Sequence, residues 1–142
     1  MIIDCHGHYT TAPKALENWR NQQIAGIKDA GSMPKVADLK ISDDELRETI
    51  EANQLKLMNE RGSDLTIFSP RASFMAHHIG DFTISSTWAA ICNELCFRVA
   101  GLFPDRFVPA AMLPQSPGVA PETCIPELVK CVEQYGNVGI NL

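Results

Sequence analysis

The sequence lacks the features of a membrane or nucleic-acid-binding protein. No apolar run within its 142 residues approaches the ~20 residues that span a bilayer. Lysine and arginine number 12 against 17 aspartate and glutamate, a formal net charge of −5, whereas an extended nucleic-acid surface requires a basic stripe. The first residues show neither the basic nor the apolar region of a secretory signal peptide. We therefore expect a cytoplasmic protein with no nucleic-acid partner and no membrane association.

Cysteines paired at metal or redox spacing are also missing. The chain has 5 cysteines, an odd number without a Cys-x-x-Cys motif, so we expect reduced and buried thiols instead of a disulfide framework. Cys92 and Cys96 stand one helical turn apart, but neither has a neighbouring histidine at ligand spacing. A metal site at these two cysteines therefore remains only a secondary interpretation.

The clearest functional signal is a histidine pair at the end of the first apolar run. His6 and His8 follow a short stretch that is typical of a strand. Residues two apart in a strand project to the same face, so both imidazoles should converge, with Asp4 beside them. Imidazole is the commonest metal-ligand side chain, and a nearby carboxylate can orient it. The pattern predicts part of a divalent metal site, with an unliganded His-x-His at a strand end as the alternative.

Strand and helix patterns alternate along the rest of the chain. Ser42 and Glu45 predict a capping box at a helix start, and Gly62 is the residue expected just after that helix. Continuously apolar runs that end at turn residues predict strands buried on both faces. We expect strands at residues 1–8, 64–69, 108–113 and 138–142, and helices at 13–25, 42–61, 85–102 and 121–135.

Two of these helices carry more detailed expectations. The second should bury one apolar stripe against the core, and the third should begin at Ser85 or Ser86, because serine is a favoured N-cap residue. The stripe consists of Leu46, Ile50, Leu55, Leu57 and Met58.

This alternation predicts an α/β fold with parallel strands and right-handed crossovers. A strand that begins near the N-terminus and ends in His-Gly-His opens many metal-dependent (β/α) barrels, whose chemistry lies at the C-terminal ends of the strands. A closed barrel of eight units takes ~250 residues. We therefore expect residues 1–142 to form a single partial domain, the N-terminal half of a TIM-like (β/α)₈ barrel from a longer enzyme.

Four stretches of the chain resemble the 4-oxalomesaconate hydratase family of the amidohydrolase superfamily. They read DCHGHYTTAPKALEN, RGSDLTIFSPRASFMAHHIGD, STWAAICNEL and AAMLPQSPG. The resemblance implies a hydro-lyase that adds water to a tricarboxylate in the protocatechuate 4,5-cleavage pathway of aromatic degradation. It also implies a Zn²⁺ ion held partly by His6 and His8, with a further histidine and a carboxylate from later strands outside this chain. For the full-length enzyme we expect a homo-oligomer.

Several polar residues at the expected strand ends are candidates for contact with such a substrate. Arg71 follows the second strand, where a guanidinium could bind a carboxylate in bidentate fashion. His77 and His78 lie in the same loop and are candidates for proton transfer, with a solvent-facing position as the alternative. The hydrogen-bond donors in these loops are Ser69, Ser73, Gln115 and Ser116.

Two other functions remain open from the sequence. A decarboxylase or hydrolase of the same superfamily would share the first-strand histidines. A non-catalytic half-barrel would pair its open edges with another copy and self-associate. Because two imidazoles bind Zn²⁺ weakly compared with three or four ligands, we expect the isolated chain to be inactive.

Overall fold

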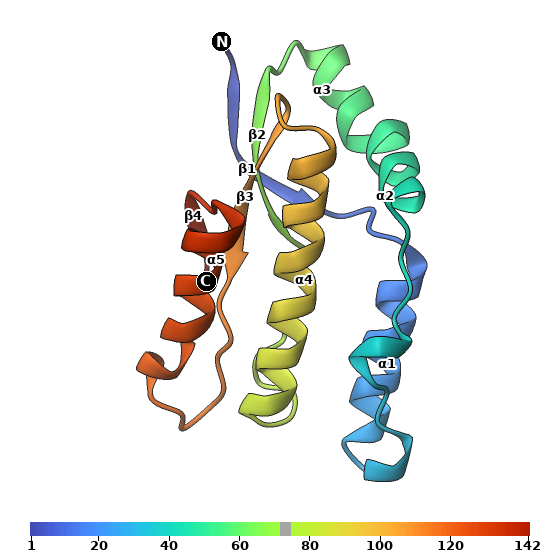
Figure 1. Cartoon of the computed structure of the whole chain (residues 1–142), viewed down its shortest axis with the longest axis vertical. Helices are drawn as coiled ribbons and strands as arrows, with labels where there is room; N and C mark the ends of the chain where they lie inside the picture. The colour runs from blue at the N-terminus through green and yellow to red at the C-terminus, as the bar shows by residue number, and fades with distance from the viewer. Residues whose placement is uncertain (72–74) are drawn as a thin grey trace.

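Four parallel strands form one curved sheet in strand order β1-β2-β3-β4. The computed structural model describes residues 1–71 and 75–142. Sequential parallel strands joined by right-handed crossovers carry their helices on one face of the sheet, and Figure 1 shows α4 and α5 packed in front of it. The expected half-barrel is confirmed. The strands are β1 (Ile3–Tyr9), β2 (Leu65–Pro70), β3 (Phe107–Met112) and β4 (Gly139–Asn141).

The helices agree with most of the expected boundaries. Helix α1, at the right in Figure 1, descends from the end of β1 and precedes the crossover helix that leads to β2. That crossover helix is continuous and consists of three consecutive parts, α2, η3 and α3. The helices are α1 (Lys14–Gly26), α2 (Asp43–Ile50), the π-helical turn η3 (Glu51–Leu55), α3 (Lys56–Arg61), α4 (Phe82–Leu102) and α5 (Ile125–Tyr135).

The predicted ends of the α2–α3 helix are confirmed. The Ser42 side chain accepts a hydrogen bond from the Glu45 backbone N–H, and the Glu45 carboxylate accepts one from the Ser42 backbone N–H. Gly62 ends the helix with φ of 68°, in the left-handed region that glycine occupies without steric cost.

The π-helical turn changes which residues face the core. Leu46 and Ile50 are fully buried, as expected. A π turn accommodates one extra residue, so the buried stripe resumes one position later than a regular α-helix would place it. Met58 is therefore buried, whereas Leu57 is 44% exposed. The prediction that Leu57 belongs to the stripe is wrong for this reason.

Helix α4 begins earlier than predicted. Its N-cap is Asp81, whose side chain accepts a hydrogen bond from the Ile84 backbone N–H. The expected start at Ser85 or Ser86 is wrong because the aspartate, another favoured N-cap residue, comes first in the chain. Ser85 consequently lies inside the helix and is buried.

Strand β1 contains one extra residue, and this reverses its side-chain alternation. Asp4 pairs with Thr66 and His8 pairs with Ser69, with the irregularity between Asp4 and Gly7. Thr66 and Ser69 are an odd number of residues apart in a regular strand, so they point to opposite faces. The expectation that Asp4 shares the histidine face is therefore wrong. Its carboxylate instead accepts a hydrogen bond from the His6 backbone N–H at 3.1 Å.

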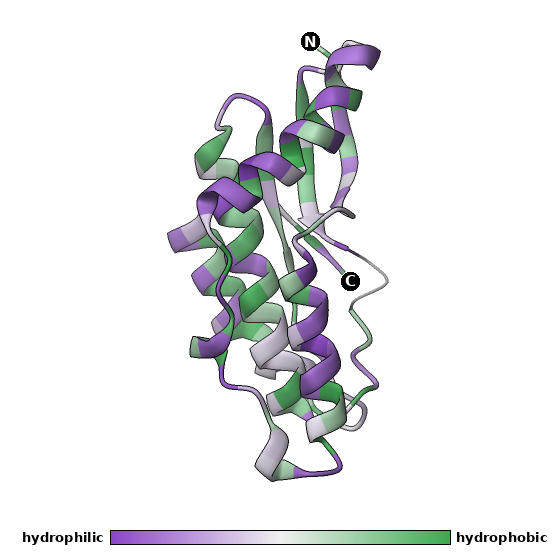
Figure 2. Cartoon of the chain, turned by 90° about the vertical axis from the view of Figure 1, so that its right-hand side faces the viewer, coloured by the Kyte–Doolittle hydropathy of each residue, from purple (hydrophilic) through white to green (hydrophobic). Residues whose placement is uncertain are grey.

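The main core lies between the sheet and its helices. Trp19 of α1 stacks on the fully buried Trp88 of α4, with ring centroids 6.3 Å apart. Figure 2, which looks onto α1 and α2–α3, shows mostly hydrophilic colour on the outward side of these helices. Among the described residues, no helix has the length and apolar character that a membrane span requires.

The cysteines are free, as expected, and three of them are buried: Cys92, Cys96 and Cys131. Cys5 is exposed, contrary to the expectation of buried thiols, because β1 is an edge strand of the sheet. Burial raises the pKa of the Cys131 thiol to about 12, so this thiol stays protonated and unreactive at neutral pH.

Candidate metal centre and strand-end site

The two histidines of β1 meet at their ring nitrogens. His6 Nε2 and His8 Nε2 lie 3.0 Å apart, and the two rings are nearly perpendicular. Both side chains project from the C-terminal half of β1, and their spacing of two residues directs them to the same side of the strand. The convergence expected from the His-x-His spacing is therefore present in the structure.

The other ring nitrogen of His8 faces oxygen atoms. His8 Nδ1 is 2.8 Å from Ser69 Oγ and 3.1 Å from the Pro70 carbonyl oxygen. A carbonyl oxygen only accepts hydrogen bonds, so this environment favours a proton on Nδ1. The lone pair of the neutral ring then lies on Nε2, the nitrogen that faces His6.

This donor set fits a divalent metal ion in part. Zinc–imidazole bonds are ~2.0–2.1 Å long, so two Nε2 atoms 3.0 Å apart can both reach one ion. Metal-bound histidines ordinarily donate their other ring N–H to an oxygen, as His8 is placed to do. Within residues 1–71 and 75–142, however, no group of three or more His, Cys, Asp or Glu side chains gathers around one point. The histidine pair alone is an incomplete ligand set.

The loop histidines His77 and His78 line an open hollow beyond the ends of β2 and β3, which His6 and His8 do not line. It has a volume of about 620 Å³ and is wide open to solvent. His77 Nδ1 is 3.0 Å from Ser85 Oγ, which also accepts a hydrogen bond from the Gln115 backbone N–H. The lining residues are Ala76, His77, His78, Gln115, Ser116 and Pro117.

His77 is held in its uncharged form. Burial, followed by the positive charge of Arg20 and by His78, lowers the pKa of His77 below its usual value. Its Nε2 atom is buried and has no hydrogen-bond partner among the residues that the structure describes. His78, in contrast, is exposed. The two histidines therefore lie in different environments, and the prediction that one of them transfers a proton stays a prediction.

The remaining predicted contacts are not gathered at one point. Arg71 is exposed and lines a small crevice with Tyr9 and Pro70. Ser69 faces His8 and not the hollow that contains Gln115. Ser73 lies outside the described residues.

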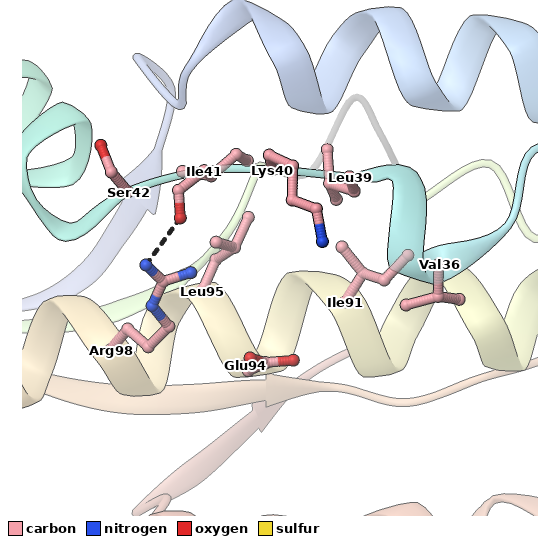
Figure 3. A pocket seen from close by; sticks show the side chains of 9 residues that line it. All are labelled: Val36, Leu39, Lys40, Ile41, Ser42, Ile91, Glu94, Leu95 and Arg98. Carbon is pink, nitrogen blue, oxygen red and sulfur yellow. Dashed lines mark hydrogen bonds between the residues drawn. The ribbon is translucent and has the colours of Figure 1, made fainter.

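A further hollow lies away from both groups of histidines, between the segment that precedes α2 and the outer side of α4 (Figure 3). Its volume is about 440 Å³. Arg98 of α4 donates hydrogen bonds to the Ile41 carbonyl oxygen at 2.8 Å and to the Asp43 carboxylate at 2.6 Å. These bonds hold the start of α2 against α4.

Two residues near the histidines escape prediction from the sequence. Asn141 of β4 donates a hydrogen bond to Ser69 Oγ at 3.3 Å. Gln54, in the π-helical turn, accepts a hydrogen bond from Thr11 Oγ1 at 2.6 Å and donates one to the His8 carbonyl oxygen at 3.4 Å. Both residues make contacts with residues that are distant in sequence, which a local pattern does not reveal. The position of Asn141 near the end of an expected strand is a local signal that could have suggested its role, and Gln54 offers no comparable signal.

The fold and the histidine pair define the class of this protein. A parallel half-barrel with two imidazoles near the C-terminal end of its first strand is typical of (β/α)-barrel proteins, whose chemistry lies at the strand ends. Within that class, the chain belongs to the amidohydrolase family, whose model matches residues 3–142.

Two hydratases are closely similar to this chain. The 2-keto-4-carboxy-3-hexenedioate hydratase of Sphingobium sp. (strain NBRC 103272 / SYK-6) is 55% identical over 142 residues, which is 100% of this chain and 41% of that protein. The crystal structure of 4-oxalomesaconate hydratase from Rhodopseudomonas palustris is 73% identical with a TM-score of 0.94, and the match covers 100% of this chain and 41% of that chain. The resemblance to this hydratase family is confirmed, and the chain spans 41% of the length of both relatives.

A decarboxylase of the same fold contains a metal ion. The dihydroxybenzoic acid decarboxylase from Polaromonas sp. JS666 was solved with bound manganese and the inhibitor 2-nitroresorcinol. It is 25% identical with a TM-score of 0.64, over 98% of this chain and 37% of that one. Relatives of this chain therefore bind a divalent metal.

Proposed function

We propose that this chain provides the first four strands of a 4-oxalomesaconate hydratase, a metal-dependent lyase of aromatic degradation. The observation that carries the proposal is the 73% identity to the Rhodopseudomonas palustris hydratase along the whole of this chain, with a TM-score of 0.94. The name of the Sphingobium relative supports the same reaction class.

The substrate named for that relative explains the chemistry required. A 2-keto-4-carboxy-3-hexenedioate has three carboxylates and a carbon–carbon double bond conjugated to a ketone. Water adds its oxygen to C4, the position β to the ketone, while C3 gains a proton. The site must therefore bind carboxylates, take a proton from water and give a proton to carbon.

We assign His6 and His8 as two ligands of a divalent metal ion, with Zn²⁺ as the specific proposal. When bound, such an ion polarises a substrate oxygen or lowers the pKa of water. The chain's own part is to hold both imidazoles on one face of β1 with their Nε2 atoms 3.0 Å apart. The remaining ligands would come from outside residues 1–142.

The loops at the strand ends supply the substrate contacts in this proposal. Arg71 would bind a carboxylate, and Ser73, Gln115 and Ser116 would add hydrogen bonds. His77 is neutral at pH 7 because burial lowers its pKa, so it would accept a proton, and the exposed His78 is the alternative carrier. We further propose a cytoplasmic homo-oligomer for the full-length enzyme and no turnover by residues 1–142 alone.

A chimeric protein tests the proposed reaction. Residues 1–142 are joined to the part of the Rhodopseudomonas palustris hydratase that follows its matched segment, and are assayed with Zn²⁺ and 2-keto-4-carboxy-3-hexenedioate. Loss of the conjugated absorbance together with a product heavier by one water supports the hydratase. His6→Ala and His8→Ala chimeras should lose the activity, whereas Gly101→Ala, remote from the strand ends, should retain it.

The same assay distinguishes the alternatives. Release of CO₂ without a hydrated product would identify a decarboxylase and refute the hydratase. A folded, metal-binding chimera that leaves the substrate unchanged would also refute it. Substitution of His77 or His78 by Gln identifies the proton carrier, since only loss of the carrier should flatten the pH dependence of kcat.

A further inference from the structure

Ser69 occupies the point where three strands of the sheet meet the histidine pair. Its hydroxyl lies 2.8 Å from His8 Nδ1, 3.1 Å from the Gly7 carbonyl oxygen and 3.3 Å from Asn141 Nδ2. The serine belongs to β2, His8 and Gly7 to β1, and Asn141 to β4. Ser69 is 5% exposed, so a water molecule has little access to compete for these contacts.

The directions of these hydrogen bonds are fixed by chemistry. A hydroxyl has one proton and two acceptor lone pairs. Its proton goes to the Gly7 carbonyl oxygen, because that atom can only accept. Both lone pairs then accept, one from the Asn141 side-chain amide and one from His8 Nδ1. The Pro70 carbonyl oxygen, 3.1 Å from the same ring nitrogen, also requires a proton there.

We propose that Ser69, oriented by Asn141, is a positioning residue that holds the proton of His8 on Nδ1. This proposal rests on the metal-ligand role proposed for His8, although the tautomer itself is a property of the metal-free chain. A proton on Nδ1 leaves the Nε2 lone pair directed at the point that His6 Nε2 also faces. The serine therefore acts through the imidazole of His8. Its position at a strand end predicted a direct contact with the substrate instead.

The arrangement also connects β4 to the histidine pair. Asn141 and Ser69 are separated by 72 positions in sequence, and β3 lies between their strands. If the asparagine is removed, the serine loses one donor and its hydroxyl can rotate. We therefore expect the same defect as from loss of the serine, but smaller.

The first test is the tautomer of His8 in the metal-free 142-residue protein. Long-range proton–nitrogen NMR correlations distinguish Nδ1–H from Nε2–H, at about two pH units above the ordinary imidazole pKa of ~6.5. We expect His8 to be predominantly the Nδ1–H form, the reverse of the preference of free histidine. A predominant Nε2–H form would overturn the proposal, whatever the reaction of the longer enzyme.

The second test measures the contribution of the hydroxyl. Ser69→Ala should lower the population of the Nδ1–H form and weaken Zn²⁺ affinity by about tenfold, the lower end of the effect seen when a ligand's hydrogen-bond partner is removed. Ser69→Thr keeps the hydroxyl and should restore both properties. Asn141→Ala should fall between Ser69→Ala and the unmodified chain.

A matched control is available two residues before β2. Ser63 Oγ is buried and has no hydrogen-bond partner among the described residues, so Ser63→Ala should change neither the tautomer nor Zn²⁺ affinity. Unchanged tautomer and affinity in Ser69→Ala would overturn the role of the serine. An equal loss in Ser63→Ala and Ser69→Ala would do the same, since it would reflect general loosening of the sheet.

Discussion

At the scale of single residues, Gly7 explains how β1 can carry two histidines and still pair with β2. A side chain at this position would enter the space of Thr66, because a Cβ atom would lie 2.2 Å from Thr66 Cγ2 and 3.2 Å from the Ile67 carbonyl oxygen. Only glycine allows the two backbones to approach this closely. The glycine between the histidines is therefore a requirement of the sheet, in addition to any effect on the site.

Gly7→Ala should lower the free energy of unfolding by about 1–3 kcal/mol, the usual cost of overpacking. Urea denaturation followed by circular dichroism measures this change. Gly101→Ala in α4, where nothing lies within 4 Å of the added Cβ, should instead stabilise by about 0.5–1 kcal/mol. Thr66→Ser removes the obstructing methyl group, so in combination with Gly7→Ala it should recover part of the loss. Strict additivity of these two changes would contradict the proposed clash.

Tyr9 gives a pH dependence of stability at the same scale. Burial raises its pKa to about 12 from an ordinary value of 10.0, while the hydrogen bond with Thr49 opposes the shift. The folded chain then keeps a proton that the unfolded chain loses, so stability is full below pH 10 and falls as the pH rises toward 12. The expected loss is about 2–3 kcal/mol.

Unfolding free energies of the unmodified chain and of Tyr9→Phe between pH 9 and 12 isolate this tyrosine from the lysines and cysteines that titrate in the same range. Their difference should shrink as the pH rises. A difference that stays constant would show that Tyr9 does not titrate in this way.

At the scale of elements, the π-helical turn η3 connects the crossover helix to the end of β1. Gln54 contacts Thr10, Thr11 and the His8 carbonyl oxygen from this turn. π turns are rare and often accompany functional sites. Here the turn brings a side-chain amide to the chain segment that directly follows the histidine pair.

Gln54→Ala should lower the unfolding free energy by about 1–2 kcal/mol, because it removes the 2.6 Å acceptor of the Thr11 hydroxyl and a donor to the His8 carbonyl oxygen. It should also speed amide hydrogen exchange in the segment after β1. Asn53→Ala is the matched control: Asn53 is exposed, and its side-chain amide donates a hydrogen bond to the Thr49 carbonyl oxygen of the same helix, so its loss should cost less than about 0.5 kcal/mol. Equal effects of both variants would show that the turn acts through helix stability alone.

At the scale of the whole molecule, the chain presents an apolar surface on α5 and β4. Ile125, Val129 and Val132 recur at helical spacing on α5 and are 49%, 43% and 52% exposed. Ile140 of the edge strand β4 is 46% exposed. Exposed apolar side chains on a helix face and on an open strand edge both favour association.

We expect the isolated 142-residue chain to self-associate in a concentration-dependent manner. Sedimentation velocity should show an average mass that rises with protein concentration, and Val132→Lys should shift the distribution toward the monomer because it places a charge on this surface. Lys56→Ala, on the exposed side of α3, should leave the distribution unchanged. A chain that stays monomeric at every concentration would contradict the expectation of a self-associating half-barrel.

The sequence by itself determined the alternation of strands and helices, the capping of α2, the His6–His8 pair and the family, because each depends on local spacing or on short strings. The tertiary structure decided the rest. The bulge that turns Asp4 away from the histidines, and the contact between Ser69 and Asn141 across 72 positions, follow from strand register. The register depends on how whole strands and helices pack, which a local pattern does not specify. The exposure of Leu57, which the sequence pattern placed in the buried stripe with Met58, likewise follows from the π-helical turn and not from local spacing.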